Sequence, residues 1–111
     1  MSAIQHYTVT HPALTPAART GSGQSSALDF FEFAEGIALV DVTAIDPGAS
    51  LVIKVETSPD QSRWWELGTM PAIITVGKQS LSLANLGRYI RATYSVTGGS
   101  ATFGVDVVGK T

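Results

Sequence analysis

The fold is decided by residues 90–107, whose sequence is IRATYSVTGGSATFGVDV. Apolar and polar residues alternate on both sides of Gly98-Gly99. The apolar positions are Ile90, Ala92, Tyr94, Val96, Ala101, Phe103, Val105 and Val107. Alternation with a period of two is typical of a half-buried β-strand, and two successive glycines can adopt the positive φ angles of a tight turn. The pattern predicts a hairpin of two antiparallel strands.

Similar patterns recur about every ten residues from Leu28 onward, the spacing expected of a sandwich or barrel. Strands are predicted over residues 37–45, 51–57, 63–67 and 73–83, the last of them broken at Gly77-Lys78. The first has apolar residues on both faces and is expected to be central, whereas the second should bury Leu51, Ile53 and Val55. We therefore predict an all-β fold, a single antiparallel β-sandwich of jelly-roll or immunoglobulin-like type, over residues 28–111.

Residues 1–27 differ from the rest in composition. Two prolines interrupt the segment 11–16, and the segment 21–26 has the Gly and Ser content of a linker. We expect an extended N-terminal arm outside the core, which orders on a neighbouring protein and can add an edge strand there. The candidate partner-binding residues in this arm are Tyr7, Val9, Leu14 and Arg19.

Composition and charge exclude several classes of function. A chain of 111 residues forms one domain with one modest core. The net charge of -2 and the lack of a basic cluster argue against nucleic acid as the main partner, and no apolar stretch is long enough to span a membrane. Without a signal peptide or cysteine, the chain is expected to be made in the cytoplasm. With only 14% charged residues, the surface suits packing against another protein.

The sequence contains no convincing catalytic or metal-binding pattern. His6 and His11 are too far apart to converge locally on one metal, and the loop at 21–26 lacks the strand and helix of a dinucleotide site. Asp41 and Asp106 are isolated acids within strands, which are usually solvated. The sequence predicts a protein that is not an enzyme and has no cofactor or metal.

Two short segments contain residues that could be exposed and contact a partner. Trp64 and Trp65 are adjacent, so a strand would turn them to opposite faces: one in the core, the other against a partner, under a covering loop or beneath a sugar ring. Tyr89 and Arg91 share the face opposite Ile90. They form either a ladder in which Arg91 pairs with Asp106 or Glu56, or a patch that docks on another subunit.

Several motifs, taken in order, resemble a family of small structural proteins of tailed phages and prophages. They are residues 18–23, 41–44, 55–60 with Trp64, 67–68, 88–92, 98–99 and 103–105, and together they cover about residues 17–110. Family members have a β-sandwich fold and a place in the virion, which the resemblance implies here as well. The family usually has a small polar residue at the position of Trp65, which assigns the core to Trp64 and the surface to Trp65. The segment 58–64 with residues 88–91 also resembles longer discoidin-type domains, through β-sandwich turns that both share.

The resemblance implies a place in the virion and does not separate the capsid from the tail. The low charge, the Pro- and Gly-rich arm and the all-β core favour a capsid decoration, or cement, protein that binds the major capsid protein on the outer surface of the virion. On a capsid we expect a homo-oligomer, a trimer in preference to a dimer, because a shell offers threefold junctions. The alternatives are a carbohydrate-binding module and an accessory protein of the tail or neck. The candidate contacts on the domain itself are Trp65, Tyr89 and Arg91.

Overall fold

The computed structural model describes residues 8–31 and 33–110, and within them it contains seven strands and no helix. The strands are β1 (Thr8–Gln24), β2 (Leu28–Asp29), β3 (Glu35–Ile45), β4 (Ser50–Ser58), β5 (Trp65–Thr69), β6 (Gly77–Ala84) and β7 (Tyr89–Lys110). All pairings between them are antiparallel, so the predicted all-β antiparallel class is confirmed. Nothing in the described ranges forms a helix long and apolar enough to cross a membrane.

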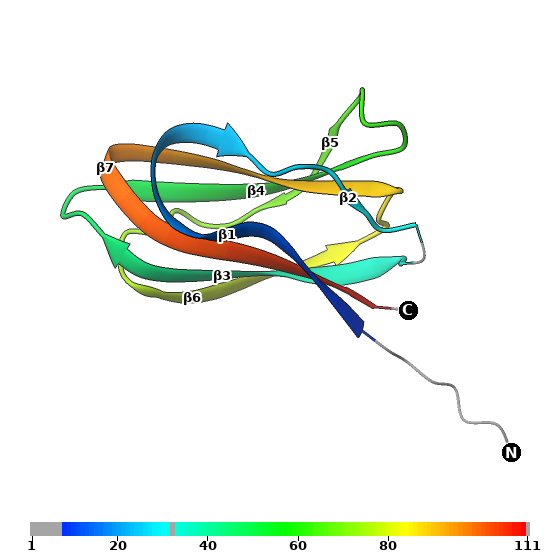
Figure 1. Ribbon diagram of the computed structural model, residues 1–111, viewed down its shortest axis with the longest axis horizontal. Coiled ribbons are helices and arrows are strands. Elements are labelled where there is room, and N and C mark those ends of the chain that lie inside the picture. Colours follow the sequence, from blue (N-terminus) through cyan, green and yellow to red (C-terminus); the bar gives the residue numbers. More distant parts are fainter. Residues whose placement is uncertain (1–7, 32, 111) are drawn as a thin grey trace, which may run out of the picture.

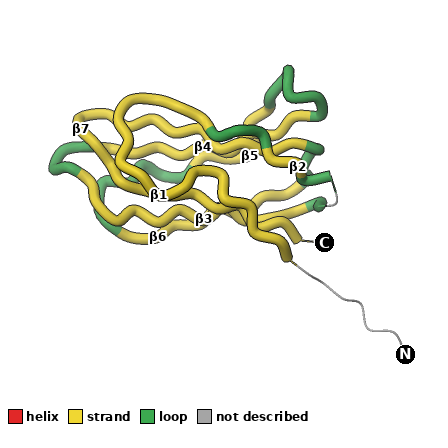
Figure 2. Tube along the Cα trace, viewed as in Figure 1, coloured by secondary structure: helices red, strands yellow, loops and turns green. Residues whose placement is uncertain are grey.

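The long strand β7 organises the sheet. Its first half pairs with β4, from Tyr89 opposite Ser58 to Thr97 opposite Ser50, and its second half pairs with β3. The strand order is β5-β4-β7-β3-β6, with β1 and β2 also paired to β7. Figures 1 and 2 show β7 turning back on itself at one end, so that its two halves lie in two facing layers, with β1 following the same turn. The sheet curls until the end strands β5 and β6 contact each other, which nearly closes it into a barrel.

The predicted hairpin of residues 90–107 is wrong in its pairing. Gly98 and Gly99 do turn the chain with positive φ angles of 77° and 152°. The two halves of β7 nevertheless do not pair with each other, because β4, β3 and β1 satisfy their backbone groups. The turn therefore joins two layers instead of two neighbouring strands. The jelly-roll or immunoglobulin-like type stays a prediction.

The N-terminal arm is a second correction. Residues 8–24 form β1, which pairs with β7 from Thr8 opposite Lys110 to Gln24 opposite Thr93. Register shifts on either side of Leu14 accommodate the prolines, and Leu14 itself is buried in the core. Ser25 continues the attachment, since its Oγ accepts a hydrogen bond of 2.9 Å from the backbone N of Ala92. Residues 8–25 thus belong to the folded domain, while residues 1–7 lie outside the described residues.

The core lies between the two layers and follows the predicted alternation. In β4 the side chains of Leu51, Ile53 and Val55 are fully buried, as expected. In β7 the inward positions are buried as well, apart from Tyr94, which packs against the core while partly exposed. The remaining large core side chains include Phe30, Phe33, Val40, Val42, Ile73, Leu83 and Phe103. In β3 only one face is buried, because Leu39 on the other face is 40% exposed.

Candidate functional site

Aromatic and arginine side chains gather at the end of the molecule opposite the Gly98-Gly99 turn. Four strands have an end there: Trp65 of β5 lies opposite Thr57 of β4, and Tyr89 of β7 lies opposite both Ser58 of β4 and Asp29 of β2. We call this region the arginine–aromatic end, and its members are Phe31, Trp64, Trp65, Tyr89, Arg63, Arg88 and Arg91. Each of its three guanidinium groups lies over at least one of its aromatic rings.

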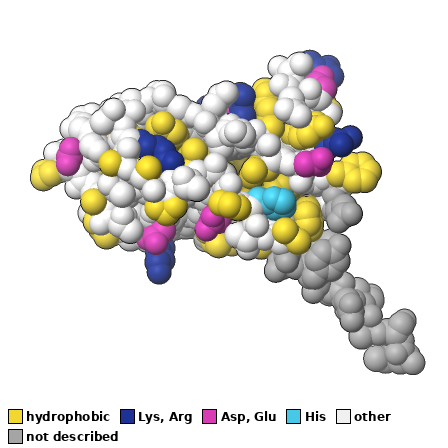
Figure 3. Space-filling model, viewed as in Figure 1, with side chains coloured by type: hydrophobic (Ala, Val, Ile, Leu, Met, Phe, Trp, Pro, Cys, Tyr) yellow, Lys and Arg dark blue, Asp and Glu magenta, His cyan; other side chains and the backbone are white. Residues whose placement is uncertain are grey.

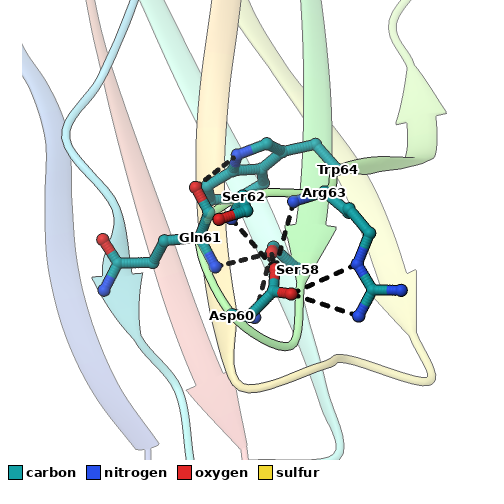
Figure 4. A network of polar contacts seen from close by, with 6 residues as sticks. All are labelled: Ser58, Asp60, Gln61, Ser62, Arg63 and Trp64. Carbon is teal, nitrogen blue, oxygen red and sulfur yellow. Dashed lines mark hydrogen bonds and ion pairs between the residues drawn. The ribbon is translucent and has the colours of Figure 1, made fainter.

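The loop after β4 is held by an internal hydrogen-bond network (Figure 4). Ser58 is fully buried, and its Oγ accepts hydrogen bonds from the backbone N of Asp60 and of Gln61. The Asp60 carboxylate accepts from the backbone N of Ser62 and Arg63 at 2.9 and 3.1 Å, and from the Arg63 guanidinium at 3.1 Å. These donors, the Arg63 backbone first, lower the pKa of Asp60 from 3.8 to about 2. The loop is therefore preorganised although it is exposed.

Trp64 lies against Arg91 and not in the core. The Arg91 guanidinium carbon is 4.1 Å from the centre of the Trp64 ring, and Arg91 Nε donates a 2.8 Å hydrogen bond to Glu56 Oε1. Trp64 Nε1 donates to the backbone O of Gln61 at 3.2 Å. Since Arg91 and Ile90 point to opposite faces, Trp64 is half-buried on the outer face of the sheet. The predicted core role of Trp64 is thus wrong, whereas the predicted pairing of Arg91 with Glu56 is confirmed.

Trp65 is 53% exposed, which confirms its predicted exposure but not its predicted facing. It lies opposite Thr57, which in turn lies opposite the buried Ile90, and residues directly opposite each other share a face. Trp65 therefore belongs to the inward row, at an open end where the Arg63 guanidinium lies over its ring but leaves more than half of the side chain exposed. A register shift between Val55 and Glu56 sets this facing, and no local pattern in the sequence signals it.

Phe31 is the residue that the sequence analysis missed. Its ring is 74% exposed, more than any other large apolar side chain of the described residues. Arg88 lies over both Phe31 and Tyr89, with its guanidinium carbon 5.3 and 5.2 Å from the ring centres, and it pairs with Asp29 at 3.4 Å. The Asp29 carboxylate also accepts the backbone N of Phe31 at 3.0 Å. Phe30 and Phe31 are adjacent aromatic residues of which only Phe30 is buried. The argument that predicts one exposed tryptophan in the pair Trp64 and Trp65 therefore applies to them as well.

A groove of about 370 Å³ continues this surface towards β1 and is lined by Val9, His11, Asp29, Phe31 and Phe33. Figure 3 shows hydrophobic side chains around a histidine on this face. The ring centre of His11 lies 4.7 Å from that of the buried Phe30. Val9, a predicted contact, is 37% exposed and stands at the rim, so it adjoins the arginine–aromatic end.

The other predicted contact residues do not join this surface. Leu14 is 8% exposed, so its role as a surface contact is corrected to one in the core. Arg19 is half-buried and donates hydrogen bonds of 2.6 Å to the backbone O of Phe103 and of Thr15. These hydrogen bonds hold β1 against β7 within a single chain, so the Arg19 side chain contacts its own domain. Tyr7 lies outside the described residues.

A second groove, of about 440 Å³, lies on the outer face of β3 and β7. It brings together Asp41 and Asp106, the two acids weighed in the sequence, with Lys78 and Leu39 at its border. In residues 8–31 and 33–110 no three His, Cys, Asp or Glu side chains are grouped so that they could hold a metal ion. The lining of this groove is mostly apolar, and the two carboxylates and Lys78 belong to its polar part.

A scan of protein-family models gives no match to this chain, and a search of curated proteins gives none either. Solved structures do resemble it. The PBSX exported protein XepA has a TM-score of 0.73 and 14% identity, over 93% of this chain and 37% of XepA. The SPBc2 prophage-derived protein YomS has a TM-score of 0.64 and 12% identity, over 98% of this chain and 99% of YomS. A chain in the structure of infectious bursal disease virus strain Gx has a TM-score of 0.59 and 9% identity, over 98% of this chain and 34% of that one. This chain therefore spans little more than a third of XepA but nearly all of YomS, and at these identities the likeness is one of fold alone.

Proposed function

We propose that this chain is a non-enzymatic structural protein of a phage virion, a decoration protein that binds the outer surface of the major capsid shell. The observation that carries the proposal is the arginine–aromatic end, where Phe31 is 74% and Trp65 53% exposed. Large aromatic side chains exposed on an ordered surface mark interaction sites, and tryptophan and arginine are prominent among residues that dominate binding energy.

The construction of this end suits binding to a protein. Arg63 pairs with Asp60 and Arg88 with Asp29, so both guanidinium groups are held in place over aromatic rings before any partner arrives. Fixing side chains in advance reduces the entropy lost on association. Because each arginine has a carboxylate beside it, the surface carries little net charge and favours apolar contact over attraction to a strongly charged partner.

The structural neighbours agree with a phage-related role. XepA and YomS are assigned to prophages by their names, and the third neighbour comes from a virus structure. Their likeness to this chain is limited to the fold, so the role in a virion and the place on the capsid are the proposal's own. The shared fold makes up nearly all of YomS and little more than a third of XepA.

The mechanism would be additive. Each copy would bury apolar area against the shell, and binding to the assembled state alone stabilises that state by mass action. Many weakly charged copies could lie close together, because a net charge of -2 gives little mutual repulsion.

The direct experiment is to strip the protein from particles of the phage that encodes it, to add it back purified, and to count bound copies per particle by quantitative mass spectrometry. A capsid decoration protein rebinds in numbers comparable to the capsid protein. Rebinding of only a few copies per particle would contradict capsid decoration and support the tail or neck accessory role. No rebinding to any part of the particle would overturn a virion role.

A carbohydrate-binding module is the second candidate, and the exposed ring of Trp65 favours it. A flat aromatic ring can stack on a sugar, and Arg63, whose guanidinium carbon lies 5.7 Å from the centre of the Trp65 ring, can offer hydrogen bonds beside it. A glycan array separates the two candidates. A sugar module retains specific glycans and loses them with Trp65→Ala, whereas a decoration protein retains none.

A further inference from the structure

The groove of about 440 Å³ on the outer face of β3 and β7 has a wall that β1 supplies. Leu14 and Pro16 line it, and the register shifts on both sides of Leu14 take this part of β1 out of the regular ladder. Gly104 of β7 makes room for the wall, because a Cβ at this position would lie 3.0 Å from Pro16 Cγ and 3.2 Å from the Leu14 backbone O. The packing of the chain itself therefore forms the groove before any ligand arrives.

The charges that line this groove do not cancel. Asp41 of β3 has Lys78 of β6 directly opposite it. Directly opposite residues are the closest cross-strand neighbours, so this carboxylate and this ammonium group offset each other. Asp41 also lies opposite Gly104, which places Asp106, two residues further along β7, on the diagonal at about 7 to 8 Å. The groove therefore has an excess of one negative charge, which belongs to Asp106.

Within the described residues, Asp106 has no cation beside it. It lies opposite Leu39 of β3 and Pro12 of β1, and its neighbours on the same face of β7 are Gly104 and Val108. Its carboxylate forms no ion pair in residues 8–31 and 33–110. Asp106 and Leu39 are both exposed, Leu39 to 40%, so both are open to a ligand. A concave, mostly apolar site thus contains one uncompensated carboxylate next to an exposed leucine.

We propose that this groove binds an organic cation, a guanidinium or ammonium group carried on an apolar body. The cationic group pairs with the Asp106 carboxylate, and the apolar body lies over Leu39 against Pro16 of the wall. Charge complementarity favours a cation, because an anion is repelled and a neutral ligand covers Asp106 without pairing it. The mostly apolar lining favours the body, since a purely polar amine gains nothing from Leu39 and Pro16. The volume lies within the range of small-ligand sites, about 300 to 1,000 Å³.

The cation is either a free amine or the basic side chain of another protein, because both offer the same groups to the groove. None of the residues of the arginine–aromatic end lines this groove. The two surfaces can therefore be occupied independently, and the inference does not depend on the proposed role in a virion.

The first experiment titrates the full, ¹⁵N-labelled chain with three probes that share one apolar body: phenethylammonium, 2-phenylethanol and 3-phenylpropionate. Phenethylammonium should shift the backbone amide signals of Gly104, Asp106 and Ser80, with a dissociation constant of about 1 mM. The alcohol should bind several-fold more weakly and the carboxylate not at all. Equal binding of the three probes overturns the inference. Shifts confined to the arginine–aromatic end, or no shift with a large excess of phenethylammonium, also overturn it.

A blocked arginine, N-acetylarginine methylamide, separates the two sources of the cation. If it binds at least as tightly as phenethylammonium, the groove takes a basic side chain of another protein. If phenethylammonium binds and the blocked arginine does not, the groove takes a free amine. Both results support an organic cation, and absence of binding by both probes contradicts it.

The second experiment repeats the titration with variants whose folding is checked by thermal melts. Asp106→Asn keeps the size of the side chain and should raise the dissociation constant of phenethylammonium by about fivefold. Glu35→Gln is the matched control, because Glu35 lies on the same face of β3 outside the groove and its loss changes the net charge equally. It should leave the affinity unchanged. Lys78→Met keeps an apolar stem and releases Asp41, so it should tighten binding about twofold. If Asp106→Asn and Glu35→Gln behave alike, or if Lys78→Met weakens binding, the groove does not recognise a cation.

Discussion

The two ends of the molecule are built from contrasting turns. At the turn end, Asp46 holds Ser100 through two hydrogen bonds of 2.9 Å, and Gly48, Gly98 and Gly99 have positive φ angles. At the arginine–aromatic end, side-chain hydrogen bonds and stacked arginines hold loops that leave Phe31 and Trp65 exposed. The turns at the first end connect the two layers of the sheet. The loops at the second end hold apolar rings exposed to water. An exposed aromatic side chain that is held on an ordered loop is therefore stronger evidence of a functional surface than exposure by itself.

The largest expected loss of stability lies at the turn end. Gly98→Ala would place a Cβ 2.6 Å from the backbone O of Gly48, at a φ of +77°. The unfavourable φ alone costs about 1 to 3 kcal/mol, and the contact adds to it. Gly48→Ala is the matched control, because its φ is +83° but no atom lies within 4 Å of the added Cβ. Thermal melts should rank Gly98→Ala well below Gly48→Ala, and equal losses would remove the role of the close approach.

A smaller loss of stability is expected at Arg91, which both pairs with Glu56 and stacks on Trp64. Arg91→Ala leaves Glu56 without its partner in a site where both side chains are less than one-fifth exposed, and it removes the group stacked on Trp64. A hydrogen bond to a charged group contributes about 1.5 to 3 kcal/mol, so we expect a loss of about 2 kcal/mol. Arg63→Ala, whose side chain is 69% exposed, should change chemical denaturation little. If the two variants unfold alike, the stacked pair does not stabilise this end.

The next effect is local and depends on pH. The folded pKa of Asp60 is lowered from 3.8 to about 2, so its contribution to stability is complete above the higher value and is lost as the pH falls towards the lower one. Asp60→Asn should speed hydrogen exchange at Ser62 and Arg63 at neutral pH, since the backbone N–H groups of both donate to Asp60. The difference between variant and unsubstituted chain should shrink as the pH falls through that range. A difference that does not vary with pH would show that the carboxylate's charge does not hold the loop.

The smallest change in stability is expected at Trp65. Its side chain is more than half exposed, and exposed substitutions usually shift the free energy of unfolding by no more than about 0.5 kcal/mol. Trp64→Ala removes the stack on Arg91 and should cost about 1 kcal/mol. A loss of several kcal/mol at either residue would mean that its ring is packed in the core, as the sequence had suggested for Trp64.

The sequence predicts well which face of a strand is buried, and it predicts poorly which strands pair with each other. The alternation of Leu51, Ile53 and Val55 correctly identified a buried face, because a period of two is a local property of the chain. The same alternation in β7 could not reveal that its halves pair with other strands, since pairing depends on residues far away in sequence.

The errors at the edges have similar causes. Prolines at 12 and 16 suggested an arm, but register shifts let β1 pass them and pair with β7. The facing of Trp64 and Trp65 was reversed by a shift in the pairing of β5 with β4, which local alternation does not encode. The exposure of Phe31 could have been predicted by the argument used for the tryptophans, because its neighbour Phe30 is also apolar and only one of the two can enter the core.

The most direct test of the central claim compares two double variants in rebinding to stripped particles. F31A/W65A removes the exposed rings of the arginine–aromatic end, and I74A/V76A removes two apolar side chains of similar exposure, 67% and 61%, that lie just before β6. Binding isotherms are measured for both, after thermal melts have shown that both are folded. The account predicts that F31A/W65A loses most of its affinity for the particle while I74A/V76A binds like the unsubstituted chain. Full rebinding of F31A/W65A would contradict the claim that the arginine–aromatic end is the docking surface.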